Sequence, residues 1–128
     1  MTIRRAAIQT DHDKIWNIFK AVIASGDTYV FDPGTPKDSL HKHWFADYMT
    51  TFVAVDGEEI VGTYIIKPNQ PDLGNHIANC SYMVAPTQQG RGTGRLLCAH
   101  SIHFAKENGY RGIQFNIVVS TNNAAVKL

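Results

Sequence analysis

The residues best suited to chemistry are the six from Gln89 to Gly94, which read Gln-Gly-Arg-Gly-Thr-Gly and contain three glycines and one arginine. They separate a strand-like run, Asn79–Val84, from a helix-like run, Arg95–Glu107. Glycine lets the chain turn with positive φ and lets a ligand approach the backbone without meeting a Cβ atom. The helix start adds unpaired N–H groups and the positive end of the helix dipole. The sequence therefore predicts an anion site suited to phosphate or pyrophosphate.

Two common phosphate-binding loops do not fit these residues. A P-loop ends in Gly-Lys-Ser/Thr, whereas this loop ends Gly94-Arg95-Leu96 and lacks both the lysine and the hydroxyl for magnesium. A dinucleotide fingerprint needs a third glycine and, about twenty residues later, an acid at the end of the next strand. The segment Gly92–Leu97 lacks that glycine, and the expected strand Gly112–Ser120 contains no acid. Both kinds of site are excluded.

The loop resembles the acetyl-coenzyme A loop of the GNAT-type N-acetyltransferases, whose pattern Q/R-x-x-G-x-G/A is met by Gln89, Gly92 and Gly94. A second segment, after the expected fifth strand, fits the opening of the family motif N-x-x-A-x-x-L-Y with Asn122, Ala125 and Leu128. The two motifs stand in the family's order, a helix and a strand apart. The resemblance implies an N-acetyltransferase that uses acetyl-CoA as co-substrate.

The resemblance also implies which residues bind acetyl-CoA. The thioester carbonyl is expected against a backbone N–H at Met83 or Val84, and the pyrophosphate on the N–H groups that follow the strand. The expected binding residues are Met83, Val84, Gln89, Gly90, Arg91, Gly92, Thr93, Gly94, Arg95 and Asn122. Arg91 and Arg95 would add charge-assisted contacts to the phosphates. The alternative for these two side chains is a solvated surface position.

Acetyl transfer requires a neutral amine, a stabilised carbonyl oxygen and a proton for the departing thiolate. In the family the base is often a glutamate on the fourth strand, but the expected strand Ile77–Val84 contains no carboxylate. Asn79 and Ser81 are the polar residues that interrupt this otherwise apolar strand. They are the candidate catalytic residues, and would position the substrate or a water that removes the amine proton. The alternative is that they face a polar rim. His100 and His103 share a helix face without a third ligand, so no metal site is predicted.

The acceptor is expected to bind Asp27, Tyr29 and Asn79. Asp27 and Tyr29 belong to a loop with further apolar residues, including Phe31, that could instead cover the core. The segment Gly26–Tyr29 resembles small-molecule and amino-acid acetyltransferases, which implies a small primary or secondary amine as acceptor. Two alternatives remain open: a non-catalytic acyl-CoA-binding or assembly module, and a protein N-acetyltransferase.

Composition indicates one soluble domain. The chain has 128 residues, of which 44% are hydrophobic, and a net charge of +1, so neither a nucleic acid nor a membrane is expected as partner. The two cysteines lack the dense spacing of a disulfide scaffold, which favours the cytoplasm. The sequence leaves the oligomeric state open, a homodimer included.

The expected element order is β-α-α-β-β-β-α-β-α, which is the GNAT order and predicts a mixed, mainly antiparallel sheet flanked by helices. Thr10 and Asp13 form an approximate capping box for the first helix, and Asp56–Glu59 is the turn of a hairpin. Asn122 is expected to begin the last helix. Residues 1–128 would thus form a single GNAT-like domain that lacks its C-terminal end, with that helix and the final two strands incomplete or absent.

Overall fold

A computed structural model describes residues 1–128 except 25–36, 38–39, 69–76, 87–91, 118–122 and 128. The strands form one sheet in the order β1-β2-β3-β4-β5-β6. Their bounds are Thr2–Arg5 (β1), Thr50–Asp56 (β2), Glu59–Pro68 (β3), Ile77–Val84 (β4), Gly112–Ile117 (β5) and Asn123–Lys127 (β6). The helices are Ile8–Ala24 (α1), Leu40–Trp44 (α2) and Thr93–Glu107 (α3).

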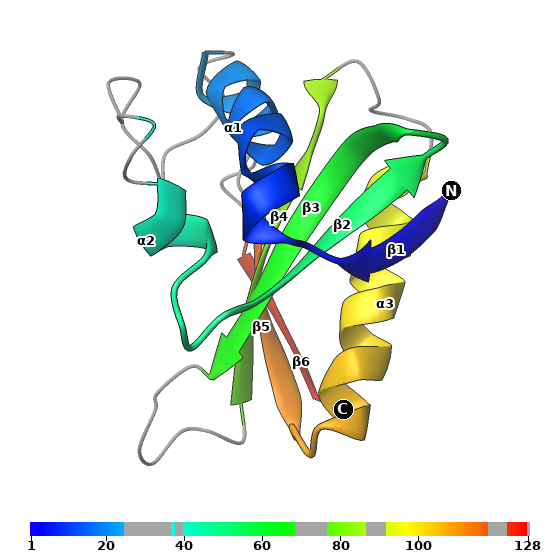
Figure 1. Ribbon diagram of the computed structural model, residues 1–128. Coiled ribbons are helices and arrows are strands. Elements are labelled where there is room, and N and C mark those ends of the chain that lie inside the picture. Colours follow the sequence, from blue (N-terminus) through cyan, green and yellow to red (C-terminus); the bar gives the residue numbers. More distant parts are fainter. Residues whose placement is uncertain (25–36, 38–39, 69–76, 87–91, 118–122, 128) are drawn as a thin grey trace.

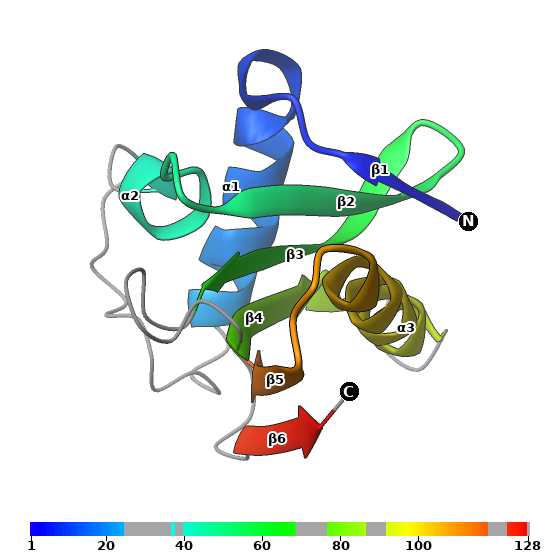
Figure 2. The same ribbon diagram turned by 90° about the horizontal axis from the view of Figure 1, so that it is seen from below.

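Neighbouring strands pair antiparallel except β4 and β5, which run parallel. The helices cover both faces of the sheet, with α1 and α2 on one side and α3 on the other (Figures 1 and 2). The crossover through α3 provides the long connection that parallel strands require. These findings confirm the predicted mixed, mainly antiparallel sheet flanked by helices.

Each face of the sheet carries its own apolar core, because successive side chains of a strand point to opposite faces. On the α1/α2 face the buried residues include Ile15, Phe19, Trp44, Val53, Ile65 and Met83. On the α3 face they include Phe52, Tyr64, Cys80, Tyr82, Leu97 and Phe115. Side chains alternate along β4, since Cys80 and Tyr82 pack toward α3 while Met83 packs toward α1 and α2.

Glycines end two of the predicted elements. Gly57 has φ +65° in the turn between β2 and β3, and Gly109 has φ +82° directly after the C-cap of α3. Both values lie in the left-handed region that glycine adopts without a Cβ penalty. The hairpin and the end of α3 are therefore where the sequence placed them.

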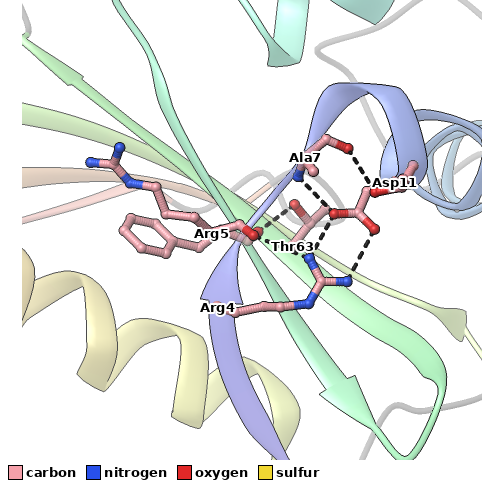
Figure 3. Close-up of polar contacts among 7 residues, drawn as sticks. Arg4, Arg5, Ala7, Asp11 and Thr63 are labelled. Atoms are coloured by element: carbon pink, nitrogen blue, oxygen red, sulfur yellow. Dashed lines mark hydrogen bonds and ion pairs between the residues drawn. The ribbon is translucent and has the colours of Figure 1, made fainter.

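The start of α1 differs from the prediction. The helix begins at Ile8, so Thr10 lies inside it and is not the N-cap. The side-chain contact at the helix start comes instead from Asp11, whose Oδ2 accepts a hydrogen bond of 2.7 Å from the backbone N–H of Ala7, the residue before the helix. The same carboxylate binds Arg4 of β1 (Figure 3). One carboxylate thus joins the first strand to the first helix.

The prediction that Asn122 begins a helix is wrong for the residues that follow it. Asn123–Lys127 is the strand β6, which pairs antiparallel with β5 from Gly112 to Asn116. A helix of so few residues is unstable without tertiary contacts. The outer edge of β5, by contrast, presents unpaired N–H and C=O groups that a strand can satisfy.

Candidate acetyl-CoA and acceptor site

The junction between β4 and α3 has the backbone geometry of an anion site. Gly92 is the N-cap of α3 with φ +83° and ψ 4°, and no side chain caps the helix. The Leu96 N–H donates to the Gly92 carbonyl at 3.0 Å, which closes the first turn. The N–H groups of Thr93, Gly94 and Arg95 precede that bond and have no intrahelical acceptor. The first turn of α3 can therefore donate to a phosphate.

Close packing holds this helix start against the sheet. A Cβ atom on Gly62 of β3 would lie 2.9 Å from Thr93 Cγ2 and 3.1 Å from Leu97 Cδ1. Thr93 is 1% exposed, and its Oγ1 lies 3.6 Å from the sulfur of Met1. On the other side of the turn, a Cβ atom on Gly94 would lie 3.7 Å from Val84 Cγ2. The N–H groups of the first turn of α3 are thus placed beside the end of β4.

Strand register distinguishes the two predicted thioester contacts. The Ala85 N–H donates to the Val61 carbonyl at 3.0 Å, and Met83 lies opposite Thr63 in the same ladder. Backbone groups of an antiparallel strand point alternately toward and away from one neighbour. The N–H of Val84 therefore points away from β3, toward the β5 side, whereas that of Met83 points to β3. Val84 is the better placed backbone donor, and the side chain of Met83 is buried beneath α1.

The structure brings Asn79 and Ser81 together on the α1/α2 face of β4, where both are half-buried. Asn79 lies opposite Lys67 of β3 and beside Gln114 of β5, and Ser81 lies opposite Ile65. Sequence reasoning did not place Lys67 or Gln114 beside Asn79. Only the register of the sheet shows that they flank Asn79.

Buried hydrogen bonds attach α2 to this face. The indole N–H of Trp44 donates to Thr63 Oγ1 at 3.0 Å, and the Thr63 hydroxyl donates to the Phe52 carbonyl at 2.7 Å. The Thr51 hydroxyl donates to the Trp44 carbonyl at 2.6 Å. His43, which precedes Trp44 on α2, therefore also lies near the sheet. Burial, together with the charges of Lys42 and Lys67, lowers the pKa of His43, so its imidazole is neutral at pH 7.

Cys80 lies on the opposite face of β4, toward α3. Burial raises the pKa of its thiol to about 12, so it is protonated at neutral pH. Only the thiolate is a good nucleophile. The position of Cys80 therefore does not support an acyl-cysteine intermediate.

Several predicted site residues lie outside the described residues: Asp27, Tyr29, Gln89, Gly90, Arg91 and Asn122. Their roles stay predictions.

Within the described ranges, no three His, Cys, Asp or Glu side chains gather closely enough to hold a metal ion. No helix in the same ranges is long and apolar enough to cross a membrane.

The sheet with its parallel β4–β5 pair, and the glycine-started helix at the end of β4, define the architecture of a GNAT-type acyltransferase. The chain belongs to the Acetyltransferase (GNAT) family, whose profile matches residues 16–128. A GCN5-related N-acetyltransferase from Kribbella flavida has the same fold with a TM-score of 0.82 and 35% sequence identity, over 90% of this chain and 70% of that one.

Two further relatives are similar over most of this chain. The N-acetyltransferase aca1 of Schizosaccharomyces pombe is 27% identical over 83% of this chain, which spans only 58% of that protein's length. A phosphinothricin acetyltransferase from Sinorhizobium meliloti, solved in complex with AcCoA, has a TM-score of 0.78 over 89% of this chain and 64% of its own. At 17% identity, it shows the shared fold alone.

Proposed function

We propose that this chain binds acetyl-CoA and transfers the acetyl group to a small-molecule amine or an amino acid by direct attack. The observation that carries the proposal is the uncapped first turn of α3 at Gly92, packed beside Val84 at the end of β4. The N–H groups of α3 would bind the pyrophosphate, and the Val84 N–H would contact the acyl group. These two contacts would lie side by side on one surface. Family membership supports the same donor.

The reaction forms one C–N bond and breaks one C–S bond. The lone pair of the neutral amine attacks the thioester carbonyl carbon, the amine then loses a proton, and coenzyme A leaves as a thiolate that takes a proton. The N–H of Val84 would stabilise charge on the carbonyl oxygen. Asn79 and Ser81 would orient the amine, or a water that accepts its proton.

A second candidate is a non-catalytic acyl-CoA-binding module. It is favoured by the composition of β4, because none of its residues, Ile77–Val84, is a carboxylate that could act as base. Both candidates bind acetyl-CoA, so affinity for acetyl-CoA does not separate them. Amine-dependent release of free thiol does.

The test combines acetyl-CoA with a panel of small amines and amino acids and measures free thiol and the mass of the acetylated product. We expect release of thiol that depends on the amine. Binding of coenzyme A without amine-dependent release from any member of the panel would favour the non-catalytic module.

Gly94→Ala tests the phosphate contact. Its new Cβ meets only Val84 Cγ2 at an ordinary 3.7 Å, so the fold should be retained, but the methyl group would block a phosphate from the backbone. We expect acetyl-CoA to bind about tenfold more weakly, about 1.4 kcal/mol. His103→Ala, at an exposed position further along α3, is the control that should bind normally.

A further inference from the structure

The α1/α2 face of the sheet changes from apolar to polar toward the end of β3. Ile65 belongs to the apolar core of that face, and Lys67, two residues further along the strand, points to the same side. Lys67 lies opposite Asn79, and Asn79 lies beside Gln114. The neighbours of Gln114 on β5, Ile113 and Phe115, pack toward α3, so Gln114 also faces α1 and α2. Lys67, Asn79 and Gln114 thus form a polar row across three strands.

Lys67 makes this row cationic. Its ammonium lies 5.6 Å from the ring centroid of Tyr48, in the segment between α2 and β2, and its side chain is half-buried. Among the residues that the structure describes, no carboxylate forms an ion pair with Lys67. Its charge also contributes to the lowered pKa of His43, which places the ammonium near α2. A half-buried cation that is not neutralised by a neighbouring acid attracts an anionic group.

The polar row lies close to the residues proposed to orient the amine. Ser81 follows Asn79 by two residues on the same face, a separation of about 7 Å along the strand. Val84, whose N–H is proposed to donate to the carbonyl oxygen of the acyl group, lies further along the same strand. An acceptor with its amine near Ser81 would therefore extend toward Lys67.

We propose that Lys67 determines acceptor specificity by binding a carboxylate of the substrate, so that the preferred acceptors are amines that carry a carboxylate group, such as amino acids. This inference rests on the acetyl transfer proposed above. The Lys67 ammonium supplies the charge, and the amides of Asn79 and Gln114 supply hydrogen-bond donors beside it. The flexible lysine stem tolerates a range of distances between amine and carboxylate.

The experiment compares each amino acid with its carboxamide, which keeps the carbon skeleton and removes the negative charge. Thiol release gives kcat/KM for alanine, β-alanine and their amides in the unaltered chain and in Lys67→Met. We expect the unaltered chain to prefer the acids. Lys67→Met should lower kcat/KM for the acids about tenfold or more, mainly through KM, and leave the amides within about twofold. Lys67→Arg should restore part of the preference.

Lys42→Met is the matched control, because it removes an exposed lysine from the adjacent helix α2. It should leave the acid-to-amide ratio unchanged. If the unaltered chain shows no preference for acids, or if Lys67→Met lowers acids and amides equally, the inference is overturned while acetyl transfer stands.

A binding measurement separates this inference from the proposed function. Calorimetric titration of the coenzyme A-loaded chain with N-acetylalanine and with N-acetylalaninamide needs no turnover. Preferential binding of the acid that is lost in Lys67→Met supports the carboxylate site even if no amine in the panel releases thiol. Equal binding of acid and amide by the unaltered chain overturns it.

Discussion

The guanidinium of Arg4 binds the carboxylate of Asp11 through two hydrogen bonds, 2.7 Å from Nη1 to Oδ2 and 3.0 Å from Nη2 to Oδ1 (Figure 3). The Asp11 side chain is only 3% exposed, whereas that of Arg4 is 49% exposed. The carboxylate also accepts the Ala7 N–H at the start of α1. The pair therefore fixes the position of β1 relative to the start of α1, and its role is structural.

Asp11→Asn should lower the free energy of unfolding by about 1–3 kcal/mol, because it removes charge-assisted hydrogen bonds from a buried group. The Arg4 hydrogen bond, and to a lesser extent the Ala7 N–H, lower the pKa of Asp11. A lowered folded pKa gives stability that is present above the unfolded value of 3.8 and is lost as pH falls through the folded value. Urea unfolding at pH 7 and pH 3 measures both effects.

The control for this prediction is Asp13→Asn. Asp13 is 78% exposed and binds Lys37 at the surface, so its removal should change stability at pH 7 by much less. Equal losses from Asp11→Asn and Asp13→Asn would contradict the role given to Asp11.

Gly62→Ala should disturb the anion site from beneath. The new Cβ would lie 2.9 Å from Thr93 Cγ2 and 3.2 Å from the Met83 carbonyl oxygen, and neither is the end of a flexible side chain. We expect a loss of about 1–3 kcal/mol in stability, together with weaker acetyl-CoA binding because the start of α3 must shift. Thermal unfolding and titration with coenzyme A measure the two effects. Gly94→Ala separates them, since it should weaken binding without the loss of stability.

Local signals in the sequence predicted much of this fold. The bounds of β4, Ile77–Val84, and the ends of α3 follow from alternation and from glycines, which act within a few residues. The glycine at the start of α3 could also be predicted, because Gly92 and the helix start are adjacent in sequence, while phosphate binding there stays a prediction. Cross-strand neighbours could not: Lys67 and Asn79 are brought together by register, which depends on the whole sheet.

The two wrong predictions have the same origin. Thr10 fits the local pattern of an N-cap, but α1 begins at Ile8, where Asp11 accepts the Ala7 N–H and is held by Arg4 from another element. Asn122 fits a helix start, but the free edge of β5 pairs with Asn123–Lys127. In both places a partner distant in sequence outweighs local propensity.

Tyr82 and Ser101 form a buried hydrogen bond of 2.6 Å between β4 and α3. The Ser101 hydroxyl donates to the Cys98 carbonyl at 2.7 Å, so the Tyr82 hydroxyl is the donor to Ser101. Ser101→Ala removes the acceptor of this buried donor and should cost about 1–3 kcal/mol. Tyr82→Phe removes the donor itself and should cost only about 1 kcal/mol.

The double variant tests whether these two losses arise from one interaction. With both partners removed, no buried donor is left unpaired, so the loss in Tyr82→Phe/Ser101→Ala should be smaller than the sum of the single losses. Urea unfolding of the four proteins gives the coupling energy. Additive losses would show that the two hydroxyls act independently.

His100 makes stability depend on pH near neutrality. Its Nδ1 lies 2.6 Å from the Tyr64 hydroxyl, and burial raises the pKa of Tyr64, so the hydroxyl stays protonated and donates to a neutral imidazole. Burial, with a smaller effect of His103, lowers the pKa of His100 below its usual 6.5. The unfolded chain therefore binds a proton first as pH falls below 6.5, and stability declines from there to the folded pKa. Above pH 6.5 the contribution is fully present.

His100→Gln should remove part of this decline. The free energy of unfolding is measured from pH 8 to pH 5 for the unaltered chain, His100→Gln and His103→Gln, the last lying 73% exposed on the same helix. His43, whose pKa burial also lowers, retains its own contribution in all three. The slope between pH 6.5 and pH 5 should therefore be shallower in His100→Gln than in the other two. Identical slopes would show that burial does not hold His100 neutral in the folded chain.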